Sequence, residues 1–181
     1  MISDAGWQDD LLAFWFGLES EQWWRADPRL DSDIRKRFLD LHEAERKHVP
    51  EQHLGSPRDA LAGVILFDQL RRNMFRGHAD QFMTDPLALA IAKGAVEKGF
   101  DDLLEPKERG FLYMPFQHSE DIADQNRSLA LFTALGDAYQ LRYAKLHHDV
   151  IGRFGRFPHR NAILGRTPRP AEIQAGDVVP W

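Results

Sequence analysis

Apolar residues recur along this chain at helical spacing and almost nowhere alternate as they do in a β-strand. Leu30, Ile34, Phe38 and Leu41 follow one another at intervals of four, four and three residues, which places them on one helix face. A capping aspartate and a proline precede this stripe, as is typical of a helix start. The pattern predicts a helix over residues 28–48.

A second stretch, residues 60–67, is apolar on every side, which predicts a helix at the centre of the fold. Asp68 and Arg72 follow it, four residues apart and therefore on one face. Because charges so close to the core must be paired, we expect an ion pair between them.

The rest of the chain shows the same kind of pattern between glycines and prolines. Further helices are predicted over residues 7–16, 85–98, 105–113 (broken at Pro115), 120–135 (capped by Ser119) and 137–154, with a short helical turn after Pro168. Trp23 and Trp24 are expected in a connecting turn. The fold class is therefore all-α: a single compact domain of about seven or more helices in antiparallel pairs.

Composition excludes several classes of function. The net charge of −5 argues against nucleic-acid binding, and no apolar run approaches the roughly 20 residues that span a bilayer. Cysteine is absent, which excludes disulfides and thiolate chemistry. The first residues lack the basic and apolar regions of a signal peptide, so a cytoplasmic location without membrane contact is expected.

One segment, Arg153–Arg166, stands out from this acidic chain. Its fourteen residues hold four arginines, His159 and Asn161, with Phe154 and Phe157 between the charges. Arginine presents a flat fork of donors that suits carboxylate or phosphate. If the two phenylalanines are buried, the arginines lie close to the core and need an anion, supplied either by the protein or by a ligand.

Further polar residues stand at predicted helix ends and, together with this segment, suggest a cleft for an anionic ligand. A histidine beside a carboxylate can move protons near neutral pH, so the catalytic candidates are His118, Glu120 and His147. The candidate binding residues are Asp68, Arg72, Asn73, Tyr113, Gln125, Arg153, Arg156, His159, Arg160, Asn161 and Arg166. The alternative is a purely structural ion network that joins helix ends, and for any single arginine this alternative is favoured.

Other chemistry has weaker support. His147 and His148 are about 100° apart around a helix, so they cannot easily share a metal. Glu45 and His48 form the only Glu-x-x-His motif, on a polar face, and excess arginine would repel a cation. We therefore expect no metal and no cofactor. No Gly-x-Ser-x-Gly elbow or phosphate-binding glycine loop occurs, so the sequence decides neither a reaction nor whether the protein is an enzyme.

The same polar clusters resemble those of a bacterial family, domain of unknown function 924, over nearly the whole chain. The motifs are Phe14-Trp15-Phe16-Gly17, Leu66-Phe67-Asp68-Gln69 with Arg72-Asn73, Arg109 with Phe111-Leu112-Tyr113, Pro115-Phe116 with His118-Ser119-Glu120, Asp124-Gln125, His147, and Arg153–Asn161 with Leu164-Gly165-Arg166. The resemblance implies an all-helical fold similar to tetratricopeptide-repeat proteins and no known activity. One departure is Arg71, where family members more often carry proline.

The leading functional hypothesis is that the protein binds an anionic small molecule, a carboxylate or phosphate, in an Arg/His-lined pocket. The alternative is a non-enzymatic, tetratricopeptide-like scaffold that binds an acidic peptide or protein. The oligomeric state stays open.

Overall fold

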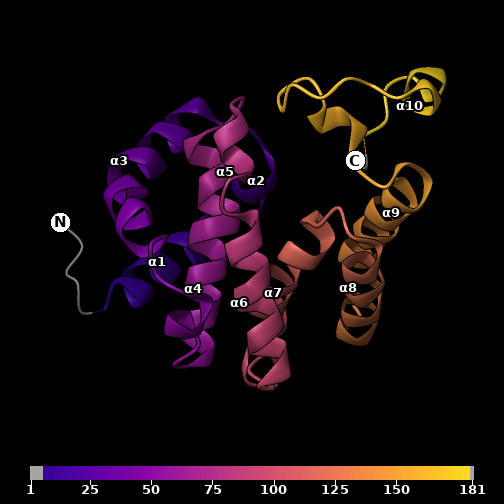
Figure 1. Ribbon diagram of the computed structural model, residues 1–181. Helices are drawn as coiled ribbons and strands as arrows, with labels where there is room; N and C mark the ends of the chain where they lie inside the picture. The colour runs from indigo at the N-terminus through magenta and orange to yellow at the C-terminus, as the bar shows by residue number, and fades with distance from the viewer. Residues whose placement is uncertain (1–5, 180–181) are drawn as a thin grey trace. The chain divides into compact units, whose positions relative to one another are not determined.

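The computed structural model describes residues 6–179, and within that range all regular secondary structure is helical (Figure 1). The all-α class is thereby confirmed. The first residues, where no signal peptide is expected, lie outside the described range. The chain divides into two compact units, residues 1–104 and 105–181, each with its own packing. Whether they act as one domain, as the length predicts, stays a prediction.

Unit 1 is built from six α-helices around a core with almost no exposed surface. They are α1 (Trp7–Phe16), α2 (Ser20–Trp24), α3 (Pro28–Glu45), α4 (Pro57–Val64), α5 (Arg71–Met74) and α6 (Asp85–Glu97). Leu11 and Trp15 of α1, Ile34 and Phe38 of α3 and Ile91 of α6 are all buried. The stripe predicted for α3 therefore faces the core, although its helix ends at Glu45.

The central helix predicted from the all-round apolar stretch is α4, which contacts both α1 and α6. Its chain continues into a π-helical segment, Ile65–Leu70, and then directly into α5. Every residue of the π-helical segment is buried. Segments with this wider turn often occur where side chains serve a special role, and Asp68 lies within it.

Unit 2 contains four α-helices, of which α8 and α9 form a hairpin packed against α7. They are α7 (Pro106–His118), α8 (Ile122–Leu135), α9 (Ala138–Phe154) and α10 (Pro170–Ala175). The break predicted at Pro115 is wrong, because α7 continues through the proline to His118. All residues from Gly110 to Gln117 are buried, so tertiary packing outweighs the one hydrogen bond that proline removes.

The segment after α9 turns sharply at Gly155, whose φ of 66° lies in the left-handed region that glycine enters without strain. Phe157 then packs back onto Val150, Ile151 and Phe154 of α9. The burial of Phe154 and Phe157, expected from the sequence, is thereby confirmed, and it fixes the start of the arginine-rich segment on α9.

Two local predictions need correction. Trp23 and Trp24 lie in the short helix α2 and not in a turn. Asp121, not Ser119, caps α8, because its side chain accepts a hydrogen bond from the Ala123 N–H. No helix among residues 6–179 is long and apolar enough to cross a membrane.

The predicted cap of α3 gives a direct test of this local reading. Asp27 accepts hydrogen bonds from the N–H groups of Arg29 and Leu30, at 2.8 and 3.4 Å. Replacing Asp27 by alanine should lower the free energy of unfolding by about 1 kcal/mol in urea denaturation. Asp40→Ala, at an exposed position on the same helix, serves as the control and should change stability by less than half as much.

Candidate functional site

Glu120 accepts hydrogen bonds from the arginine-rich segment of unit 2. Its carboxylate accepts two hydrogen bonds from Arg166, at 2.7 and 3.1 Å, and one from the Phe157 N–H at 2.7 Å. Although burial opposes it, the pKa of Glu120 is lowered by the hydrogen bonds from Arg166 and Phe157. Glu120 therefore stays ionised, and three donors already occupy the carboxylate predicted to be catalytic.

Glu172 of α10 is the second acid that the arginine-rich segment contacts. Arg156 donates to it from Nε at 2.6 Å and from Nη2 at 2.8 Å, and Asn161 Nδ2 donates at 2.9 Å. The Arg169 N–H adds a bond of 2.7 Å. The hydrogen bond from Arg156 is the main cause that lowers the pKa of Glu172 to about 2. Arg156 and Asn161 thus already bind Glu172 within unit 2.

A histidine cluster forms where the end of α7, α9 and the segment after α9 meet. The ring centroids of His118 and His147 are 6.2 Å apart, and those of His147 and His159 lie 5.5 and 5.6 Å from the Phe157 ring. The Arg160 guanidinium lies over the same ring at 4.5 Å and donates to the His118 carbonyl at 3.2 Å. We call His118, His147, His159 and Arg160 the histidine cluster.

The histidine cluster keeps two of its imidazoles neutral. Burial, followed by the charges of His118 and Arg160, lowers the pKa of His147 to about 3. Burial, followed by Arg160, lowers the pKa of His159 to about 4. His147 is confirmed to point inward, since it is only 2% exposed, and its Nδ1 bonds the Tyr143 carbonyl at 2.8 Å.

The other predicted residues of unit 2 have varied surroundings. Arg153 is exposed, 3.5 Å from Asp149. Tyr113 is buried with its ring edge-on to that of Phe132. Gln125 Nε2 bonds two carbonyls at the end of α7, both at 2.7 Å. An open hollow of about 470 Å³ also lies in unit 2, but two carboxylates and no cation line it; its residues are Glu120, Asp121, Ile122, Ile151, Gly152 and Gly155.

In unit 1 the predicted site residues are paired within the unit. Arg72 reaches Asp68 at 3.1 Å, as expected, and grips Asp85 with two bonds of 2.9 and 3.0 Å. Asn73 donates to Asp31 at 2.8 Å, beside the guanidinium of Arg76. Arg72 therefore links the π-helical segment, α5 and α6, whereas Asn73 links α5 to α3 in a separate set around Asp31.

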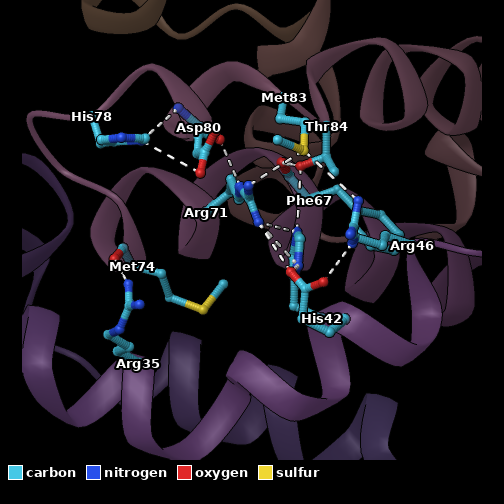
Figure 2. Close-up of polar contacts among 11 residues, drawn as sticks. Arg35, His42, Arg46, Phe67, Arg71, Met74, His78, Asp80, Met83 and Thr84 are labelled. Carbon is cyan, nitrogen blue, oxygen red and sulfur yellow. Dashed lines mark hydrogen bonds and ion pairs between the residues drawn. The ribbon is translucent and has the colours of Figure 1, made fainter.

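Arg71 is buried at the centre of a second network (Figure 2). Its Nε donates to the Asp80 carbonyl at 2.7 Å, its Nη1 lies 3.3 Å from His42 Nδ1, and its guanidinium covers the Phe75 ring at 3.8 Å. Glu43 supplies the nearby carboxylate at 3.5 Å. The charge of Arg71 is thus paired within unit 1.

The protonation of His42 follows from its neighbours. Thr84 Oγ1 donates its one proton to the Phe67 carbonyl at 2.7 Å, so it can only accept from His42 Nε2, 3.4 Å away. Burial, followed by the charge of Arg71, lowers the pKa of His42 to about 4, so the ring is neutral. Its Nδ1 lies between a donor and an acceptor, 3.3 Å from Arg71 Nη1 and 3.4 Å from Glu43 Oε1.

The predicted site residues therefore lie in several sets: the histidine cluster, two clamps around Glu120 and Glu172, and ion pairs in unit 1. Sequence reasoning missed Glu172, because a short C-terminal helix carries no mark of its distant partner. It also missed the pairing of His42 with Arg71. The inward position of His42 could have been found, since it lies one turn beyond Phe38 on the apolar face of α3.

Comparison with known proteins agrees with the motifs. Residues 11–175 match the family described as bacterial protein of unknown function (DUF924). The chain belongs to this family. It is also similar to a solved structure, the protein of unknown function ATU0120 from Agrobacterium tumefaciens, with 39% identity and a TM-score of 0.89 over 96% of this chain and 98% of that one. No curated protein matches the chain.

The neutral buried histidines predict a specific pH dependence of stability. Because the pKa values of His42 and His147 are lower in the folded chain than the ordinary 6.5, the unfolded chain binds more protons below that pH. The free energy of unfolding should therefore be highest above about pH 6.5. It should decrease as the pH falls towards 4, by up to about 1.4 kcal/mol per pH unit for each histidine.

Urea denaturation at a series of pH values measures this slope. The lowered pKa values of Glu120 and Glu172 act only below about pH 4.5, so the interval above it reports the histidines. His42→Gln should flatten the slope, whereas His78→Gln, at an exposed histidine of the same unit, should not. An unchanged slope in His42→Gln would contradict the assignment.

Proposed function

We propose that unit 2 binds a small carboxylate or phosphate anion at the histidine cluster. The observation that supports this most directly is the convergence of three imidazoles and a guanidinium around the Phe157 ring. His118 and His159 can each present an N–H donor, and Arg160 adds a permanent charge. The Nδ1 proton of His147 is donated to the Tyr143 carbonyl, so this ring offers an N–H to an anion only from Nε2 and only when it is protonated. This proposal keeps the anionic ligand of the leading hypothesis. It places the ligand at the histidine cluster and not at Arg156 and Arg166, because these two arginines bind carboxylates of the protein.

Access to the histidine cluster is through its partly exposed members. His118 and His159 are half-buried, whereas His147 and Arg160 are buried. A ligand that reached the two outer rings would bring its charge towards the two inner groups. Charged groups of a ligand interact more strongly where little water screens them.

Binding and proton transfer are coupled in this proposal. With pKa values of about 3 and about 4, His147 and His159 are poor bases at neutral pH. An anion beside them stabilises the charged form and raises both pKa values. Acid–base chemistry by His147 with His118, the catalytic part of the hypothesis, therefore requires a bound anion, and Glu120 contributes by holding the segment in place.

The finer predictions about architecture and setting also stay proposals. The α8–α9 hairpin is a unit of the kind that tetratricopeptide-like superhelices stack, and such a scaffold would bind an acidic peptide. No contact of the described residues favours the peptide over a small anion. The cytoplasmic location expected from the cysteine-free composition likewise stays a prediction.

Nuclear magnetic resonance of the histidine rings tests the anion proposal. Titration with phosphate and, separately, with citrate should raise the pKa of His147 and His159 in the wild-type chain and saturate with ligand concentration. His159→Ala should weaken the binding about tenfold, since it removes one donor that reaches the anion.

His148→Ala is the matched control, because His148 follows His147 on α9 but is only partly buried and bonds Asn126 at 2.9 Å. It should bind the anion as the wild type does. If neither anion moves the resonances of His147 or His159, the histidine cluster is a structural feature and the proposal fails.

A further inference from the structure

Three potential metal ligands converge where α3 ends in unit 1. Glu45 is the last residue of α3, His48 follows three residues later, and His53 ends the 3₁₀ turn Pro50–His53. One ligand atom from each residue lies within 4.8 Å of the other two. His48 Nδ1 and Glu45 Oε2 are 3.2 Å apart, and the rings of His48 and His53 have centroids 6.2 Å apart.

His53 is the fixed member of this group. Its side chain is 3% exposed and packs against Gly63, with the Trp7 and Phe67 rings edge-on at 6.5 and 5.2 Å. Its Nε2 is enclosed and has no hydrogen-bond partner among the residues that the structure describes. A buried polar atom without a partner is costly, and a bound ion is one of its ordinary explanations.

The surrounding charges favour a cation. The carboxylates of Glu45 and Asp59 both act on His53, whereas His48 acts in the opposite sense, and the carbonyl end of α3 adds partial negative charge. Burial is the main cause that lowers the pKa of His53, so the ring is neutral near pH 7. Neutral imidazole and ionised carboxylate are the forms that coordinate metal ions.

We propose that Glu45, His48 and His53 bind a divalent transition-metal ion of the zinc type. Two imidazoles and one carboxylate, with a fourth position open to water, are a common zinc ligand set. Tetrahedral ligand atoms about 2.1 Å from zinc are about 3.4 Å from one another, so the group must contract modestly. The Glu45 and His48 side chains, 18% and 44% exposed, have room to do so around the fixed His53.

The bound ion would tie the end of α3 to the turn that leads into α4. The sequence argued against metal here because Glu45-x-x-His48 is a single motif on a polar face. The fold changes this conclusion, because it adds a buried third ligand from the next turn. The site lies in unit 1, so it is independent of the anion proposed for unit 2.

Calorimetric titration of the full chain with zinc chloride tests the proposal. The wild type should bind one ion per chain at a saturable site, and both His48→Ala and Glu45→Gln should weaken this binding at least about tenfold. Both side chains are partly exposed, so the variants should keep the fold, as circular dichroism can verify. Cobalt(II) should give the visible absorption of a four-coordinate site in the wild type and lose it in His48→Ala.

The matched control is His78→Ala, which removes a histidine that lies 3.4 Å from a carboxylate, Asp80, but has no third potential ligand among residues 6–179. It should bind zinc as tightly as the wild type. Absence of saturable binding in the wild type, or equal zinc affinity in His48→Ala and wild type, would overturn the proposal.

Discussion

Two carboxylates, the partly buried Glu120 and the buried Glu172, determine the shape of the last third of the chain. An ionised group removed from water must be matched by donors, and Glu120 and Glu172 each meet this demand with a guanidinium and a backbone N–H. The arginine-rich segment therefore folds onto the protein's own acids. As a consequence, Phe157 is fixed against α9, and His159 and Arg160, which follow it, lie near the end of α7. The histidine cluster depends on this clamp, because His159 and Arg160 stand on the clamped backbone.

The helices could be predicted because their signals are local. The apolar stripe of α3, its aspartate cap and the all-round burial of α4 each follow from neighbours in sequence, and the structure confirms them. Pro115 shows the limit of such signals. Its ring removes one hydrogen bond, but Phe111 and Phe116 on either side are buried, and packing of this kind is stronger than a single lost bond. Burial by distant elements cannot be read from the local pattern.

For the candidate site, the sequence predicted only that the arginines need negatively charged partners. An excess of arginine in one segment indicated that an anion was needed, but not which one. Arg166 finds Glu120 across 46 positions and Arg156 finds Glu172 across 16, and no periodicity records such pairings. The Asp68–Arg72 pair could be predicted, since four residues on a helix are neighbours in space. His53 escaped notice for the same reason as Glu172: its partners are brought to it by the fold.

Burial alone does not determine what a histidine binds. Burial is the main cause that lowers the pKa of both His147 and His53, so both rings are neutral at physiological pH. Their neighbours differ in sign: Arg160 and the other imidazoles surround His147, whereas two carboxylates act on His53. A neutral imidazole can offer either an N–H to an anion or a lone pair to a metal ion. The sign of the neighbouring charges therefore favours the anion that we propose for unit 2 and the metal ion that we propose for unit 1.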